Sequence, residues 1–269
     1  MYNLTELHKF MQPFVKLLLS LLLAHLLGDF PLQTSAMVRG KSRGRRAYFL
    51  HGAVHLFSLT ICVAVFAGTA WFDSWQFWVA VVLYIAVHLT IDRVKQWTVS
   101  TGRLPDSTWA FVFDQALHLG TILALVWFLA RPDWAAVRQV FRWSPITGER
   151  VLQAAVVYVA VVFVGGYFIR YLTRNLAAGI DKPGETAEQV KNAGLYIGWL
   201  ERFLVLTAIL VQSPSLIGLI LTGKSIARFP DLKERFAEYF LIGTLLSITL
   251  AVLGGLMLTK LWYGSILLK

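Results

Sequence analysis

Charged residues and cysteine are scarce in this chain of 269 residues. Charged residues make up only 15% of the sequence, whereas a typical soluble domain has roughly 25%. The single cysteine, Cys62, excludes an intrachain disulfide and argues against a thiolate metal site. The sequence also lacks a nucleophile elbow, a phosphate-binding glycine loop, a CxxC pair and a nucleotide-binding motif. The usual signatures of covalent catalysis and of nucleotide-dependent enzymes are therefore missing.

Long apolar runs are abundant instead, and hydrophobic residues account for 57% of the chain. Several runs, such as residues 151–172, approach the roughly 20 residues that a helix needs to cross the hydrocarbon core of a membrane. Residues 14–27 have the apolar character of a secretory signal, but no small-residue cleavage site follows them, so we expect a permanent helix there. The sequence predicts an all-α, polytopic transmembrane protein.

The expected helices form two groups. The first four cover residues 14–32, 47–69, 75–94 and 108–129. Because short connections make neighbouring helices antiparallel, we expect an N-terminal four-helix bundle within residues 1–130. A polar connection at residues 131–150 then leads to a C-terminal helical subdomain at residues 151–269.

A break at Ser213, Pro214 and Ser215 interrupts the second group. The apolar piece before it, residues 200–212, has 13 residues. At 1.5 Å per residue it spans about 20 Å, which is too short for a core of about 30 Å. Two alternatives stay open, a re-entrant helical hairpin and a kinked full crossing. The last crossing is expected at residues 238–262.

The formal net charge of +10 comes mainly from short connections between apolar runs. We interpret this pattern as the positive-inside rule and not as nucleic-acid binding. Basic residues gather at residues 39–46 and again at residues 93–103, which predicts that the first and third connections are cytoplasmic and the N-terminus is outside. The four arginines of residues 131–150 count against this orientation, because that segment is expected outside.

Each of the four N-terminal helices carries a pair of polar side chains four residues apart. The pairs are His25 and Asp29, His51 and His55, His88 and Asp92, and Asp114 and His118. Residues four apart project from one face of a helix, so both side chains of a pair can reach the same ion. The pairs lie near the ends of the first and third helices and near the starts of the second and fourth. An antiparallel bundle therefore brings all of them to one face of the membrane, which is cytoplasmic by the charge pattern.

The pattern favours a bound cation. A single His/Asp pair is more often a structural hydrogen bond, but three intramembrane aspartates each cost about 2.5 to 3.5 kcal/mol on insertion scales and need a compensating partner. Five imidazoles with three carboxylates suit zinc first, with iron, manganese or nickel as alternatives. Eight ligands exceed one structural zinc site, which indicates two ions or one ion with supporting residues. Gln33 and Gln115 are candidates for donors that support the metal ligands, although we favour their interpretation as ordinary polar residues at helix ends.

These segments resemble a family of bacterial inner-membrane proteins of uncharacterised function. The resemblance rests on AHLLGDF at residues 24–30 and on the HxxxH, HxxxD and DQxxH segments that follow. The second half is similar to longer members through GWLER at 198–202, KSIARF at 224–229 and AEYFLIGT at 237–244. The resemblance implies a shared fold and a bacterial inner-membrane location, but no reaction. A more remote similarity links the helical His/Asp pairs to membrane-bound metal-dependent hydrolases.

The leading hypothesis is hydrolysis of an ester, phosphoester or amide at the membrane surface by metal-activated water. Whichever of Asp29, Asp92 and Asp114 is not a metal ligand serves as general base. Five basic side chains are candidates for binding an anionic lipid-like substrate: Arg93, Lys95, Arg202, Lys224 and Arg228. The plainer interpretation is that they mark cytoplasmic helix ends and attract anionic membrane lipids.

Two other functions are compatible with the pattern. Intramembrane histidines and aspartates also mark ion pathways, so a divalent-metal or proton-coupled transporter is the second hypothesis. Transport sites tend to lie near the membrane midplane, whereas these pairs are expected at one face, which favours the hydrolase. A di-iron oxidase or desaturase is the third hypothesis, and the three aspartates argue against it.

Overall fold

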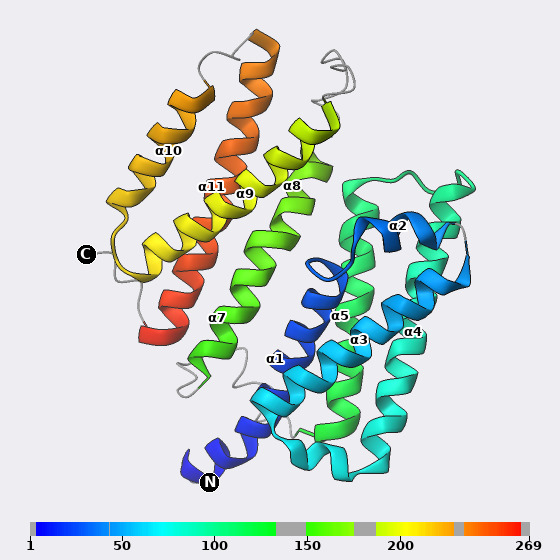
Figure 1. Ribbon diagram of the computed structural model, residues 1–269. Helices are drawn as coiled ribbons and strands as arrows, with labels where there is room; N and C mark the ends of the chain where they lie inside the picture. The colour runs from blue at the N-terminus through cyan, green and yellow to red at the C-terminus, as the bar shows by residue number, and fades with distance from the viewer. Residues whose placement is uncertain (1–3, 43, 133–148, 175–186, 229–233, 265–269) are drawn as a thin grey trace. The chain divides into compact units, whose positions relative to one another are not determined.

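The computed structural model describes residues 4–42, 44–132, 149–174, 187–228 and 234–264. Within these residues the chain is helical and contains no strand (Figure 1). The chain divides into two compact units, residues 1–144 with 149–156 and residues 145–148 with 157–269. Residues 133–148, which make up most of the predicted polar connection, lie outside the described residues.

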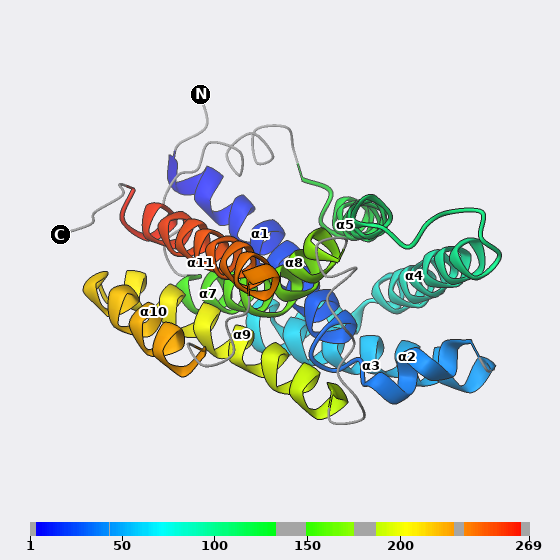
Figure 2. The ribbon, with the colours of Figure 1, turned by 90° about the horizontal axis from the view of Figure 1, so that it is seen from above.

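The first unit is built on four long helices: α1 (Leu4–Asp29), α3 (Arg45–Cys62), α4 (Trp75–Ser100) and α5 (Thr108–Ala130). Helix α1 packs against α3 and α5, and α4 packs against the same two helices, so the four close into a bundle (Figures 1 and 2). Apolar side chains such as Leu17, Phe77 and Ile122 fill its interior. The predicted N-terminal four-helix bundle is confirmed.

Shorter elements complete the first unit. Helix α2 (Ser35–Lys41), which the sequence did not predict, packs on α3, and Thr34 caps it by accepting a hydrogen bond from the Met37 amide. A π turn, η1 (Val63–Ala67), extends α3, and a 3₁₀ turn, η2 (Thr69–Asp73), leads into α4. Between the two turns, Gly68 has a φ of 98°, a left-handed conformation that favours glycine.

A helical rod, whose first turns belong to the first unit, is followed by three helices of the second unit. The rod consists of α7 (Arg150–Val159), the π turn η3 (Ala160–Val164) and α8 (Gly165–Thr173). The three helices are α9 (Ala187–Leu210), α10 (Ser215–Arg228) and α11 (Glu234–Tyr263). Helix α9 packs against η3, α10 and α11. The first turns of α7, up to residue 156, group with the first unit.

The helix before the proline break is longer than predicted. It begins at Ala187 and has 24 residues, not the 13 expected at residues 200–212. At 1.5 Å per residue, α9 is about 36 Å long, whereas the 14 residues of α10 span about 21 Å. The two helices pack together on either side of the break. A helical hairpin is therefore present, and its re-entrant placement in a membrane stays a prediction.

Five helical segments among the described residues are long and apolar enough to cross a membrane. They are Arg45–Ala67, Trp75–Ser100, Thr108–Ala130, Arg150–Thr173 and Phe240–Tyr263. Large apolar side chains on these segments face outward, for example Phe57, Val82 and Phe113, each more than 60% exposed. A polytopic membrane protein exposes such side chains to lipid, which is as apolar as they are. Length, composition and surface all indicate a multi-pass membrane protein.

Candidate metal centre

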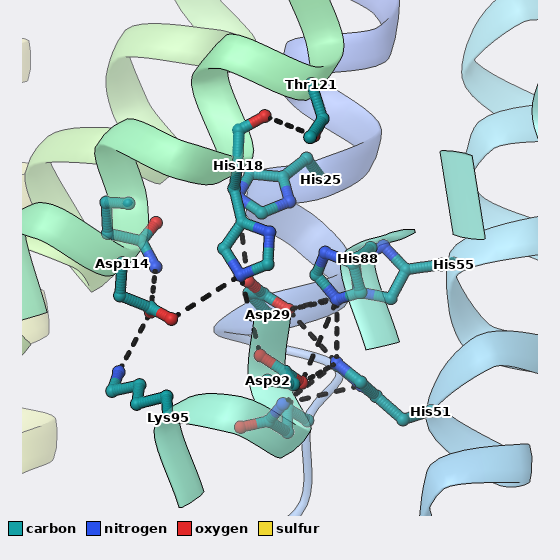
Figure 3. A network of polar contacts seen from close by, with 12 residues as sticks. His25, Asp29, His51, His55, His88, Asp92, Lys95, Asp114, His118 and Thr121 are labelled. Atoms are coloured by element: carbon teal, nitrogen blue, oxygen red, sulfur yellow. Dashed lines mark hydrogen bonds and ion pairs between the residues drawn. The ribbon is translucent and has the colours of Figure 1, made fainter. Parts of the chain in front are cut away.

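The four polar pairs meet inside the first unit (Figure 3). The rings of His51, His55, His88 and His118 are 1% exposed or less, and His25 is 3% exposed. The side chains of Asp29, Asp92 and Asp114 are 8%, 12% and 6% exposed. These residues come from all four helices, and the i,i+4 spacing points both members of each pair toward the centre of the bundle.

Asp29 lies among the histidines. Its Oδ1 atom is 3.0 Å from the Nε2 atom of His55, 3.2 Å from that of His51 and 3.4 Å from that of His88. Its other oxygen, Oδ2, is 3.6 Å from the Nε2 atom of His25. One carboxylate oxygen therefore shares a small volume with three imidazole nitrogens from two other helices.

Asp92 and Asp114 continue the cluster. The two oxygens of Asp92 reach different histidines, with Oδ2 3.2 Å from His51 Nε2 and Oδ1 3.5 Å from His118 Nε2. Asp114 Oδ1 is 3.6 Å from the same His118 nitrogen. Three overlapping groups have ligand atoms within 4.8 Å of one another: Asp29 with His51, His55 and His88; His25 with His88 and His118; and Asp92 with Asp114 and His118.

The cluster has more lone pairs than hydrogens. The Nε2 atoms of His51 and His88 are 3.1 Å apart, and a hydrogen bond between them requires one of them to carry the proton. Among the described residues, His118 Nε2 and Asp114 Oδ1 are buried without a hydrogen-bond partner, as are the Nδ1 atoms of His25, His88 and His118. Buried polar groups in native proteins are normally paired, and an ion is one explanation for those that are not. Five imidazoles and three carboxylates are a donor set that fits a divalent metal such as zinc.

Gly28 makes room for one of the histidines. A Cβ atom at this position would lie 2.6 Å from Cε1 of His55, closer than real Cβ atoms approach other atoms. The His55 ring therefore packs directly on the backbone of α1, beside Asp29. This contact explains the glycine within the HLLGD segment, which the sequence alone did not.

Two lysines border the cluster. Lys41, on α2, places its Nζ atom 2.5 Å from Asp92 Oδ2, and its side chain is only 9% exposed. Lys95, on α4, places its Nζ atom 2.9 Å from Asp114 Oδ2. Lys95 was among the predicted substrate-binding residues. Lys41 was counted only as a topology signal, because α2 and its long-range contact were not foreseen.

The contacts of Gln33 and Gln115 favour the alternative that they support the candidate ligands over their interpretation as ordinary helix-end residues. The Nε2 atom of Gln33 lies 3.3 Å and 3.4 Å from the two ring nitrogens of His51. The Nε2 atom of Gln115 donates to Asp114 Oδ2 at 3.1 Å. Both amides therefore touch cluster residues and help to orient them, as the outer partners of metal ligands do.

The remaining predicted substrate-binding residues have different surroundings. Arg93 is exposed and lies 5.9 Å from the ring centre of Tyr48, as does the Nζ atom of Lys41. In the second unit, Arg202 is buried, and three of its nitrogens donate to the Val162 carbonyl and the Ser247 hydroxyl. Lys224 pairs with Glu201 at 2.6 Å. Arg228 ends α10, and its side chain lies outside the described residues.

Comparison with known proteins supports a family resemblance but no activity. A family model described as a protein of unknown function (DUF3307) matches residues 17–143. That range contains all eight candidate ligands, together with Lys41 and Lys95. No curated protein and no solved structure matches the chain. The match agrees with the resemblance to an uncharacterised family, and the GWLER, KSIARF and AEYFLIGT segments lie beyond it.

Proposed function

We propose that this protein is a membrane-embedded, metal-dependent hydrolase that cleaves a lipid-like or membrane-associated ester or phosphoester at the cytoplasmic face of the bacterial inner membrane. The main support for this proposal is the position of Asp29 Oδ1, which lies within 3.4 Å of imidazole nitrogens from His51, His55 and His88. One carboxylate and three imidazoles are a typical ligand set for zinc, with iron or manganese as alternatives. A bound metal makes a coordinated water acidic enough to attack an ester near neutral pH.

The cluster offers ligands for one ion or two. Asp29 with His51, His55 and His88 would hold the first ion, and Asp92 with His118 would contribute to a second. His25, which contacts Asp29 and stacks near His118, supports both groups. Asp114 contacts only one histidine, so it is the carboxylate left to accept a proton as general base.

The location of the cluster also supports hydrolysis of a substrate held in the membrane. The cluster lies in a bundle with three candidate membrane spans, near the helix ends that the basic connections assign to the cytoplasm. Membrane lipids are therefore the natural surroundings of the site and the nearest source of substrate. The basic connections also favour contact with anionic lipids.

Elemental analysis of the purified protein tests the metal site. We expect one or two zinc, iron or manganese ions per chain in the wild type, loss of most of this metal in His51→Ala, because His51 contacts both Asp29 and Asp92, and loss of the second ion in Asp92→Ala. His8→Ala is the matched control, since His8 is the histidine outside the four pairs. Equal, substoichiometric metal in the wild type and the variants would contradict the proposal.

Transport of a metal ion or proton is the second candidate, and one observation favours it. The hydroxyls of Ser20, Ser58 and Tyr84 are buried without a hydrogen-bond partner among the described residues. Each lies about one helical turn from a histidine of the same helix, on the side away from the predicted cytoplasmic end. Polar atoms thus continue from the cluster toward the middle of the bundle.

Assays in reconstituted vesicles separate the two functions. The hydrolase predicts turnover of a lipid ester that needs the metal and is lost in Asp114→Asn, without metal flux. Transport predicts metal or proton flux that falls in Tyr84→Phe, without turnover. Flux without turnover would therefore exclude the hydrolase.

A further inference from the structure

Lys41 and Lys95 form ion pairs with aspartates of the cluster. Lys41 contacts Asp92, and Lys95 contacts Asp114 (Figure 3 shows Lys95). They come from different elements, α2 and α4, yet they pair with two aspartates that lie in one group of candidate ligands, with ligand atoms within 4.8 Å of one another. Burying a lysine is costly, so the largely buried position of Lys41 implies an electrostatic role.

The net charge of the cluster changes sign when a metal ion binds. With neutral imidazoles, three carboxylates and two ammonium groups leave one negative charge. One divalent ion changes this to one positive charge, and two ions change it to three. Uncompensated charge is costly in a buried setting. The positive charge of the metal-loaded cluster therefore favours an anionic substrate over a neutral carboxyl ester or amide.

We infer that the substrate carries a phosphate ester and that Lys41 and Lys95 bind its phosphate oxygens. This inference rests on the proposed function and deepens it. An ammonium group has three N–H donors, so each lysine can keep its aspartate and also donate to a phosphate oxygen. A phosphate brings one or two negative charges, which offset the single positive charge left by one metal ion and part of the three left by two.

Arg93 adds a third, solvent-exposed positive charge near Lys41. Its guanidinium and the Lys41 ammonium lie at equal distances, 5.9 Å, from the ring centre of Tyr48. Arg93 is exposed, whereas Lys41 is almost buried. A phosphate approaching the cluster from this side meets Arg93 first and Lys41 last, so Arg93 guides the anion and the lysines hold it.

Binding of inorganic phosphate to the zinc-loaded, detergent-solubilised protein tests the inference without requiring turnover. Isothermal titration calorimetry should show phosphate binding to the wild type and about tenfold weaker binding to Lys41→Gln and to Lys95→Gln, as expected when one charged hydrogen bond is lost. Arg103→Gln is the control, because it removes the same charge from a side chain that stacks on Trp97 just beyond the C-terminal end of α4 and, among the described residues, forms no ion pair with the cluster aspartates. Zinc content should be unchanged in all three variants.

The outcomes separate the two proposals. If the wild type holds no metal, both fail. If it holds zinc but does not bind phosphate, or binds it equally well in the lysine variants, only the phosphate inference fails. Loss of zinc from Lys41→Gln or Lys95→Gln would also overturn it, since the lysines would then position the aspartates.

A competition experiment identifies the source of the phosphate. Nanodiscs of phosphatidylcholine with phosphatidic acid should weaken the apparent binding of inorganic phosphate if the substrate is a lipid, and nanodiscs of phosphatidylcholine alone should not. Lysine-dependent phosphate binding that neither lipid affects would support a soluble phosphoester. Equal competition by both nanodiscs would point to a membrane effect and contradict lysine-specific recognition.

Discussion

Both units bury charged side chains between apolar helices, but they balance them differently. In the second unit the Arg202 guanidinium donates to the carbonyl of Val162, which lies in the π turn η3, and to the hydroxyl of Ser247. In the first unit, imidazole nitrogens and carboxylate oxygens face one another, and several have no hydrogen-bond partner among the described residues. A donor-rich guanidinium meets acceptors in the second unit, whereas acceptors outnumber the imidazole N–H donors in the first.

This difference separates structural polar networks from candidate binding sites. Arg202 finds its partners within the chain and needs no ligand to be stable in an apolar setting. The histidine and aspartate cluster contains too few hydrogens to satisfy itself, so a cation is the simplest complement. Buried charge alone is therefore a weak indicator of function, and the balance of donors and acceptors is a better one.

The largest expected effect comes from removing the central carboxylate charge. Asp29→Asn keeps the shape of the side chain but removes the charge that three imidazoles surround. We expect zinc affinity to fall by more than about 100-fold, because even the partners of metal ligands contribute 10- to 100-fold. Competition with a chromophoric chelator measures it. Unchanged affinity would show that the cluster, like Arg202 in the second unit, is stable with the partners that the chain itself provides.

An intermediate effect is expected from a substitution in the second unit. It should lower the stability of the protein and leave its metal content unchanged. Arg202→Met leaves the Val162 carbonyl buried without its donors. The free energy of unfolding should fall by about 1 to 3 kcal/mol, the cost of one unsatisfied buried group. Thermal denaturation in detergent measures this change, and elemental analysis should show wild-type metal content. If Arg202→Met lost metal but kept its stability, Arg202 would contribute to metal binding and its purely structural role would be contradicted.

The smallest effect is expected from crowding one histidine. Gly28→Ala would push the His55 ring away from α1, and we expect zinc affinity to fall about tenfold, similar to the loss of a supporting contact. Gly120→Ala is the matched control, because Gly120 lies on α5 and a Cβ there meets open space. The control should keep wild-type affinity, and helix propensity favours it slightly. Equal affinity for zinc in both variants would argue against close packing at His55.

The main features of the first unit follow from local patterns in the sequence. Long apolar runs predicted the helices, and the starts of α4 at Trp75 and α5 at Thr108 agree with the prediction. The i,i+4 pairs share a helix face for geometric reasons, and the alternation of helix direction brings their ends together. The grouping of the eight candidate ligands was therefore predictable, although their binding of a metal stays a prediction.

Long-range contacts were not predictable in the same way. The ion pair between Lys41 and Asp92 joins residues 51 positions apart, and α2 is too short to show an apolar period. Helix α9 continues into a polar stretch with no apolar signal, so its start was placed too late. The role of Arg202 depends on a π turn, which leaves no mark in residue composition.

The π turn η3 also adds one residue to the continuous helix that α7 and α8 form with it. A π turn holds one more residue than the α turn it replaces, and each residue of an α-helix rotates the chain by about 100°. Deleting one residue among Ala160–Val164 would close the π turn to an α turn and leave α8 nearly in place, but it would remove the wide turn whose Val162 carbonyl accepts from Arg202. The number of residues in this helix is therefore constrained by a hydrogen bond to Arg202 as well as by the thickness of the bilayer.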